Sequence, residues 1–176
     1  MKTGELVKLR TVEQKDLEQL KNWRNREEFK KHFREYLELN DLNQIEWFEN
    51  EVNKSNRTIM FSIVDAGTDN LIGCCGLTYI NWVYRNADFS FYIGKDDLYI
   101  DELGYSIEAA KILLDYAFNQ LNLHKIWTEI YEFDNQKKKF LRLLSFNLDA
   151  KLREHYFYDG RWWDSLIFSL LKEEFK

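Results

Sequence analysis

Two acidic residues lie in segments whose residue pattern predicts β-strands, and both are candidates for accepting a proton. In the first segment, apolar residues alternate with Asp88, Ser90 and Tyr92, so these three side chains share one face of the expected strand. Glu129 and Tyr131 share a face of a second expected strand. A carboxylate beside a cleft can act as a general base. The alternative for each acid is an exposed sheet residue or a hydrogen-bond anchor.

A loop and a glycine precede one predicted helix, and this arrangement suits an anion. Apolar residues from Ile107 to Leu121 fall on one helical face. The helix start, from Leu103 through Gly104 to Ser106, would present free backbone N–H groups and the positive end of the helix dipole to a phosphate. Nearby negative charge opposes such a ligand and comes from Asp96, Asp97, Asp101 and Glu102. A capped helix without a ligand is the alternative.

The composition favours one folded domain over residues 1–176. The chain is 45% hydrophobic and 16% aromatic, which argues against disorder, and its net charge of −5 argues against broad nucleic-acid binding. The sequence shows no N-terminal signal and no apolar run of membrane-spanning length. We therefore expect a cytoplasmic protein with neither a nucleic-acid nor a membrane partner.

The two cysteines are expected to be buried thiols rather than a disulfide or a metal site. Cys74 and Cys75 are adjacent in a predicted strand, so their side chains point to opposite faces. No His, Cys and acidic residues occur together at metal-ligand spacing, and no Ser/His/Asp hydrolase pattern is present. We expect no metal.

The predicted elements alternate between helices and strands without a domain boundary. Asn43 and Glu46 form a candidate N-cap pair for one helix. Three successive strands separated by short polar turns predict an antiparallel meander. In chain order the elements are a strand over 6–10, helices over 16–25, 27–36 and from residue 43, strands over 58–65, 71–80 and 87–94, a helix over 104–121, a strand over 124–133, a helix over 136–144 and a hairpin over 151–158 and 162–171.

These features together resemble the GCN5-related N-acetyltransferase (GNAT) superfamily over nearly the whole chain. Its acyl-CoA signature, Gln/Arg-x-x-Gly-x-Gly/Ala, is similar to Asp101-Glu-Leu-Gly104-Tyr-Ser106, although an Asp stands at the first position. Glu108-Ala109 follows, and the later elements come in the family's order. The resemblance looks closest to ribosomal-protein N-terminal acetyltransferases and amino-sugar acetyltransferases. It implies an α+β fold with about seven strands in a mostly antiparallel mixed sheet, splayed strands 4 and 5, and about four flanking helices.

The resemblance also implies where acetyl-CoA would bind. Pantetheine would lie between the splayed strands 88–94 and 124–133, and backbone N–H groups would hold the pyrophosphate. The expected cofactor-binding residues are Phe91, Tyr92, Ile93, Leu103, Gly104, Tyr105, Ser106, Asp134, Asn135 and Lys138. Basic side chains at Lys137, Lys138, Lys139 and Arg142 could approach the 3′-phosphate of CoA, or could form a solvated helix face.

One residue of the family's catalytic pattern is missing. Many members protonate the departing thiolate with a tyrosine, whose position falls on Leu141, and the family's glycine position falls on Ser145, ahead of Phe146. Candidate stand-ins are Tyr131, Tyr105 and Ser90, or water. The amine substrate must itself lose a proton, for which Asp88 and Glu129 are the candidates.

The substrate side is expected at the first helices and at the loop before the third meander strand. Its candidate residues are Trp23, Arg24, Arg34, Tyr36, Trp82 and Arg85. Arginines beside aromatic rings suit a phosphate-bearing ring such as a nucleotide-linked amino sugar, and equally an acidic peptide or simple packing.

The resulting hypothesis is an N-acetyltransferase that moves an acetyl group from acetyl-CoA to a primary amine by direct attack in a ternary complex. The amine would belong to a small molecule or, alternatively, to a peptide N-terminus. The other alternative is a degenerate, non-catalytic acyl-CoA-binding module, which Asp101, Leu141 and Ser145 favour. A homodimer is one expectation for the assembly.

Overall fold

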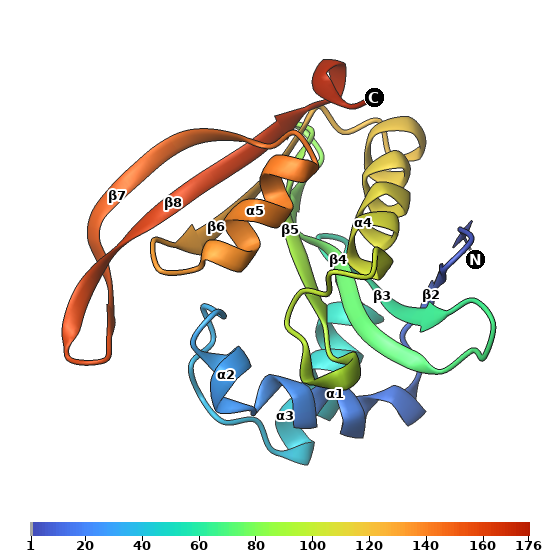
Figure 1. Cartoon of the computed structure of the whole chain (residues 1–176). Helices are drawn as coiled ribbons and strands as arrows, with labels where there is room; N and C mark the ends of the chain where they lie inside the picture. The colour runs from blue at the N-terminus through green and yellow to red at the C-terminus, as the bar shows by residue number, and fades with distance from the viewer. Residues whose placement is uncertain (1) are drawn as a thin grey trace.

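The computed structural model describes residues 2–176, and one mixed sheet runs through the molecule (Figure 1). Within the described residues the sheet has eight strands in the order β1-β2-β3-β4-β5-β6-β8-β7. All neighbours are antiparallel except β5 and β6. The strands are β1 (Lys2–Thr3), β2 (Val7–Thr11), β3 (Ile59–Asp65), β4 (Leu71–Asn81), β5 (Asn86–Ile93), β6 (Lys125–Tyr131), β7 (Asn147–Tyr158) and β8 (Arg161–Leu171).

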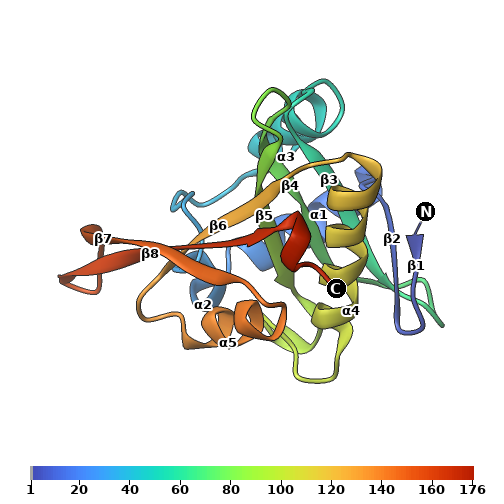
Figure 2. The ribbon, with the colours of Figure 1, turned by 90° about the horizontal axis from the view of Figure 1, so that it is seen from above.

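Helices cover both faces of this sheet, which buries the core on each side. Helices α4 and α5 lie on one face, and α1 and α3 lie on the other, as Figures 1 and 2 show from two directions. Helix α2 lies near the place where β5 and β6 separate (Figure 1). The helices are α1 (Leu17–Arg24), α2 (Glu27–Lys30), α3 (Asp41–Glu46), α4 (Tyr105–Asp115) and α5 (Asn135–Leu143). The predicted single-domain α+β fold with a meander and a closing hairpin is confirmed.

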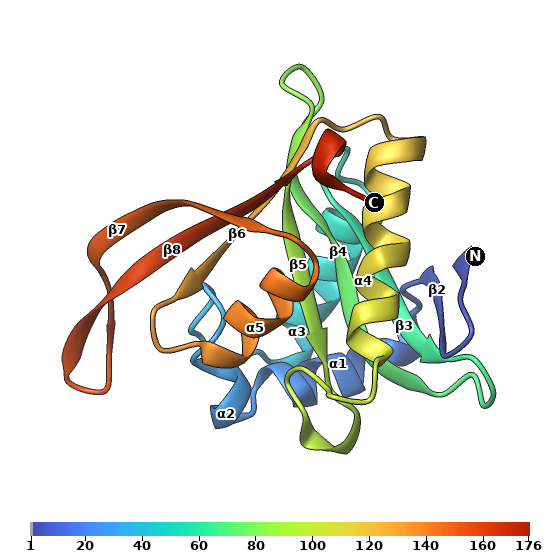
Figure 3. The same ribbon diagram turned by 45° about the horizontal axis from the view of Figure 1, so that its top comes forward.

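The two parallel strands part after a short pairing. Their register joins Asn86–Asp88 of β5 to Lys125–Trp127 of β6, and no further pairs follow. The remainder of each strand therefore diverges, and this gap is the predicted splay (Figure 3). The closing hairpin β7–β8 pairs with β6 through β8 and projects beyond the body of the molecule (Figures 1 and 3).

Strand β5 differs from the half-exposed strand expected from its alternation. Its apolar face carries Phe89 and Phe91, which stack on each other with ring centroids 5.5 Å apart. Its polar face is also covered, because Tyr92 packs edge-on against Trp23 and Phe33. Asp88 on that face is consequently buried as well.

The predicted helix 27–36 is mostly wrong, since α2 ends at Lys30. The next residues turn in different directions to reach separate partners. The ring of His32 stacks on Tyr99 at 4.4 Å, and Phe33 packs against Tyr92 and Tyr99. A continuous helix could not satisfy these contacts at once, so tertiary packing overrides the helical spacing.

The predicted N-cap of α3 is displaced by three residues. Asn40 is the cap, and its side chain accepts a hydrogen bond from the Asn43 N–H at 2.9 Å. The Asn43 side chain accepts the Asn40 N–H in return at 3.0 Å. Asn43 therefore takes the third helical position of a capping box instead of starting one.

No helix within residues 2–176 is long and apolar enough to cross a bilayer.

Candidate active site

A cavity of about 490 Å³ opens where β5 and β6 part. Its walls include the segment after α2, the end of β4, both splayed strands and α5, so residues from distant parts of the chain meet there. The polar side chains that matter for chemistry are Arg34, Thr78, Asp88, Ser90, Glu129 and Lys137.

Asp88 is a buried carboxylate with one oxygen free. The residue is 1% exposed, and its Oδ2 accepts hydrogen bonds from the Arg34 guanidinium and from the Thr78 hydroxyl, the latter at 3.0 Å. Its Oδ1 has no hydrogen-bond partner among the described residues. Burial raises the pKa of Asp88, while Arg34 and Thr78 oppose that rise. The geometry therefore leaves a proton acceptor on the cavity wall.

Glu129 is a second acid on the cavity wall, contributed by β6. Its side chain is largely buried, and its Oε1 lies 3.9 Å from His155 Nε2. The Arg34 guanidinium lies between these acids and the aromatic surface, 5.3 Å from the ring centroid of Tyr79 and 5.7 Å from that of Trp127. The structure thus brings Asp88 and Glu129 to one cavity.

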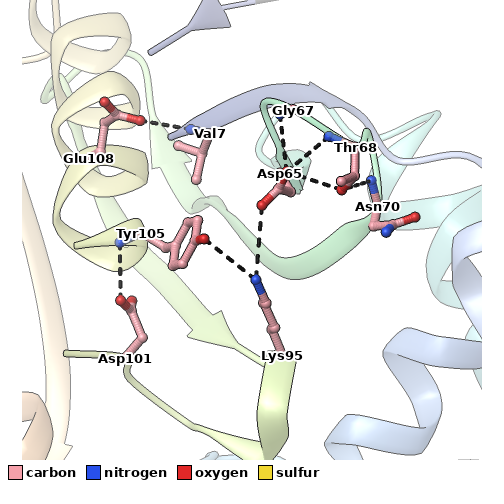
Figure 4. A network of polar contacts seen from close by, with 9 residues as sticks. All are labelled: Val7, Asp65, Gly67, Thr68, Asn70, Lys95, Asp101, Tyr105 and Glu108. Atoms are coloured by element: carbon pink, nitrogen blue, oxygen red, sulfur yellow. Dashed lines mark hydrogen bonds and ion pairs between the residues drawn. The ribbon is translucent and has the colours of Figure 1, made fainter. Parts of the chain in front are cut away.

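Tyr131 is not brought to this cavity. Its ring stacks on Tyr156 of the hairpin at 3.7 Å, and burial raises the pKa of its phenol. Of the other two candidate stand-ins for an acid, Ser90 lines the cavity. Tyr105 lies elsewhere, with its hydroxyl 3.5 Å from Lys95 Nζ (Figure 4). Leu141 is fully buried in the apolar core.

Lys137 occupies the gap between the splayed strands, where the sequence predicted only a solvent-facing or phosphate-binding cation. Its ammonium donates to the backbone carbonyl of Phe91 at 2.6 Å. Burial lowers the pKa of Lys137 to about 8, although Asp134 and Asp88 favour the charged form. Asp134 caps α5 by accepting the Lys137 N–H at 2.8 Å, and its Oδ2 lies 3.1 Å from His32 Nδ1.

The start of α4 shows the geometry of an anion site, but its donors are already used. The Asp101 carboxylate accepts the N–H groups of Leu103 at 2.8 Å, Tyr105 at 3.0 Å and Ser106 at 2.6 Å (Figure 4 shows the Tyr105 bond). Gly104 makes this turn with a φ of 103°, which other residues rarely adopt. The Asp101 side chain thus folds back onto its own helix, as in the capped helix that was the alternative to an anion site.

The remaining expected cofactor residues fall into three places. Phe91 lines the cavity, whereas Tyr92 and Ile93 are buried beyond it. Asn135 and Lys138 line a shallow hollow of about 350 Å³ with Lys139 and Arg142. Helix α5 thus places its basic side chains on both an inner and an outer face.

The expected substrate residues are divided between the cavity and other surfaces. Arg24 and Arg34 line the cavity. Trp23 is buried under Gly94, where an added Cβ would lie 2.0 Å from the indole ring, and Tyr36 is exposed. Trp82 donates to the Asn56 carbonyl at the far β4–β5 turn.

Arg85 also lies at that turn, since its carbonyl accepts the His124 N–H at 2.6 Å. Neither Trp82 nor Arg85 lines the cavity.

Several cavity residues carried no recognisable sequence signal. Glu35, Glu51 and Arg57 come from loops or helix ends, and Thr78 and Tyr79 end a strand that reads as apolar. Their partners are remote in sequence, so their meeting depends on strand order. Within residues 2–176, no three His, Cys, Asp or Glu side chains are placed to hold a metal ion.

Comparisons with known proteins agree with this architecture. Residues 9–167 match the acetyltransferase (GNAT) domain family. An uncharacterized N-acetyltransferase, p20, of Bacillus licheniformis is 32% identical over 126 residues, covering 72% of this chain and 69% of that protein.

Two solved structures of spermidine N-acetyltransferase from Vibrio cholerae are also similar. The complex with CoA and spermine has a TM-score of 0.87 at 26% identity, covering 97% of this chain and 98% of that one. A dodecameric intermediate state has a TM-score of 0.79 at 25% identity, covering 97% and 96%. The expected resemblance to the ribosomal-protein and amino-sugar branches is therefore corrected, because these relatives are spermidine N-acetyltransferases.

The family match spans most of the chain, and the splayed parallel strands are those of the matching structures. Acetyl-CoA is the acyl donor of this family. The chain belongs to the GNAT acetyltransferase family and is an N-acetyltransferase.

Proposed function

We propose that this N-acetyltransferase acts on a primary amine of an aliphatic polyamine such as spermidine. The observation that carries the proposal is the free Oδ1 of buried Asp88 in the cavity, where it can accept a proton from a bound ammonium group. The spermidine N-acetyltransferases of known structure supply the substrate class. An amino sugar has less support than the sequence resemblance suggested.

The chemistry requires a neutral amine. A bound ammonium gives one proton to the Asp88 carboxylate, and the freed nitrogen forms a bond to the acetyl carbonyl carbon as the carbon–sulfur bond of the thioester breaks. As the amide forms, the nitrogen loses its second proton to water and the departing sulfur takes a proton from water, so the products are an N-acetylamine and the thiol. Asp88 contributes by holding and accepting the proton, and Arg34 and Thr78 fix its carboxylate in place.

The charge distribution of the cavity supports a substrate with more than one ammonium group. Four carboxylates line it, from Glu35, Glu51, Asp88 and Glu129. Two of the cationic side chains that line the cavity already contact other groups of the protein. Arg34 is paired with Asp88, and Arg57 donates to the Ile80 carbonyl at 3.4 Å. Of the other three carboxylates, Glu35 accepts the Leu37 N–H at 3.2 Å, Glu51 accepts the Thr58 hydroxyl at 3.0 Å, and Glu129 lies 3.9 Å from His155. A carboxylate accepts several hydrogen bonds, so each can also bind an ammonium group of a polyamine.

One observation favours a second candidate, an amine that also carries an anionic group. The Arg24 guanidinium lies 4.0 Å from the ring centroid of Phe33, and its Nε has no hydrogen-bond partner among the described residues. An anionic oxygen would satisfy that donor. A peptide N-terminus beside an acidic side chain belongs to this class.

The test is acetyl transfer from acetyl-CoA, followed as thiol release, with a matched set of acceptors. Spermidine and spermine represent the first class. A nucleotide-linked amino sugar and an acidic-tailed peptide represent the second, and an amine with every nitrogen acetylated is the blank. We expect the polyamines to give the highest kcat/KM. Preferred turnover of an anionic acceptor would overturn the polyamine proposal.

A further inference from the structure

The backbone donors at the start of α4 hold an anionic group that belongs to the chain itself. Three N–H groups point to one carboxylate, and Asp101 is almost completely buried. A carboxylate bound in this way is a chemical counterpart of a phosphate oxygen on a helix N-terminus. Any anionic ligand that uses the same donors must first displace Asp101.

A second internal group fills the neighbouring position between the splayed strands. The Phe91 carbonyl lies on the β5 edge that β6 leaves unpaired, where an amide N–H of a ligand arm could bind. The Lys137 ammonium already donates to this carbonyl at 2.6 Å. Its position is surrounded by the rings of Phe91, Tyr99 and Phe140, at 5.3 to 5.8 Å from the ring centroids.

Two further contacts close the path between these positions. The Gln136 side chain of α5 donates to the Ile100 carbonyl at 3.2 Å. Lys139 of the same helix lies 3.5 Å from Glu102. The loop before α4 is thereby tied to α5.

The cavity ends where these contacts join the loop before α4 to α5. Its lining includes Phe91, Tyr99 and Lys137. Of the described residues between 101 and 106, none lines it. The open volume therefore stops at Lys137 and does not continue to the start of α4, although both places lie along the route expected for an acyl-CoA.

We propose that the acyl-CoA site of this chain is self-occupied, with Asp101 in the place of a phosphate and Lys137 in the place of an amide donor. This inference rests on the proposed use of acetyl-CoA. The donor then binds by displacing two internal groups of opposite charge, and its affinity is lowered by their contacts. The Asp101 carboxylate, which departs from the family pattern, and the Lys137 ammonium together act as a gate on the donor site.

The first experiment is calorimetric titration of CoA and acetyl-CoA into Asp101→Gln and into the wild-type protein. Loss of the internal cap is expected to tighten binding about tenfold, because an N-cap contact of ordinary strength no longer competes. Glu18→Gln is the control. It removes the same charge from an exposed residue of α1, away from the start of α4.

The second experiment tests the other internal group without changing the α4 cap. Lys137→Met removes the ammonium and keeps the length of the side chain, and we expect CoA to bind severalfold more tightly. Lys15→Met is the control, because this exposed lysine pairs with Glu13 and lies outside the gap. Melting temperatures of all four variants establish that each is folded.

The outcomes separate this inference from the proposed function. Tighter CoA binding by both Asp101→Gln and Lys137→Met, but not by their controls, supports self-occupation whether or not polyamines are acetylated. Equal affinities for the wild-type protein and these two variants would overturn it. Normal CoA binding without transfer to any polyamine would instead remove the proposed substrate.

Discussion

At the residue scale, the proposed chemistry depends on Asp88, and the environment of this residue sets the direction of the expected pH dependence. Burial raises the pKa of this carboxyl, so the group becomes protonated at a higher pH than an exposed Asp and then cannot accept a proton. The rate should therefore fall as pH decreases through that raised pKa.

Asp88→Asn should lower kcat by about a hundredfold near neutral pH, because the amide cannot accept the proton. The difference should narrow at high pH, where the substrate amine loses its proton to water. The measurement is kcat/KM against pH for the wild-type enzyme, Asp88→Asn and Glu129→Gln. If Glu129→Gln alone removes the pH dependence, Glu129 is the base. If neither variant changes it, no carboxylate of the cavity takes the proton.

Lys137 gives a prediction for the pH dependence of stability. A lysine that gains a partner on folding makes stability fall as pH rises, whereas Lys137 should make it rise. Its pKa is about 8 in the folded protein, below its ordinary value of 10.5, because burial disfavours the ammonium. Between these values the unfolded chain binds more protons, so the free energy of unfolding should rise with pH.

Below pH 8 the folded state carries the full cost of the buried charge. Lys137→Met should remove this slope, which amounts to about 1–3 kcal/mol over the window. Urea midpoints at pH 7.5 and pH 10 measure it, with Lys138→Met as the control. If the stability of the wild-type protein and that of Lys137→Met change equally with pH, the pKa of Lys137 is not lowered by burial.

Leu141 stands at the position expected for the tyrosine that protonates the thiolate in many members of the family. The side chain is fully buried, so a phenol placed there would be overpacked and its hydroxyl left without a partner. Leu141→Tyr should reduce the free energy of unfolding by about 1–3 kcal/mol without raising the acetylation rate. Leu143→Tyr on the exposed side of α5 is the control. A faster, equally stable Leu141→Tyr enzyme would show that this position does face the reacting sulfur.

At the element scale, one helical carboxylate fixes the β1–β2 turn and the start of β2 to α4. Glu108 accepts the N–H groups of Glu5 at 2.9 Å and of Leu6 and Val7 at 2.8 Å (Figure 4 shows the Val7 bond). In Glu108→Gln an amide NH₂ would face some of these donors, and we expect a loss of about 1–2 kcal/mol of stability. Chemical denaturation measures it beside Glu102→Gln, which should be nearly neutral. Equal effects of the two changes would mean that the contact contributes nothing specific.

Helices and strands were predictable where the spacing of apolar residues in the local sequence determines them. The alternation predicted the bounds of β5 within one residue, and the apolar face predicted over 104–121 matches α4 together with the π-helical segment Tyr116–Gln120 that continues it. The short α2 was not, because Phe29, His32 and Phe33 are placed by partners that follow far along the chain. Helical spacing in the sequence does not show whether such distant tertiary contacts will override the helix.

The candidate site was predictable only in part, for the same reason. Asp88, Glu129 and Arg34 could be chosen from strand faces and neighbouring rings, and all three reach the cavity. The inward turn of Lys137 and the backward turn of Asp101 could not, since both depend on carbonyl or N–H groups that only the folded chain presents. Spacing alone places a residue on an element and does not say which backbone group it binds.

At the scale of the whole molecule, the hairpin β7–β8 remains without a cover. Strand β7 ends the sheet, pairs only with β8 along its length, and is exposed over most of its residues. A long exposed edge strand is a template for pairing with another chain. The tip carries Phe157 and Trp162, which contact each other edge-on at 5.2 Å and are both more than half exposed.

We expect this hairpin to pair with a second copy of the chain, which keeps the homodimer as a prediction. Replacing both Phe157 and Trp162 with Ser should shift the mass in light scattering toward the monomer, since it removes the apolar contact without touching the core. Leu103→Ser, which removes an exposed apolar side chain at the start of α4, should leave the mass unchanged. A wild-type protein that is monomeric at all concentrations, or a double variant with unaltered mass, would place the contacts between copies elsewhere or nowhere.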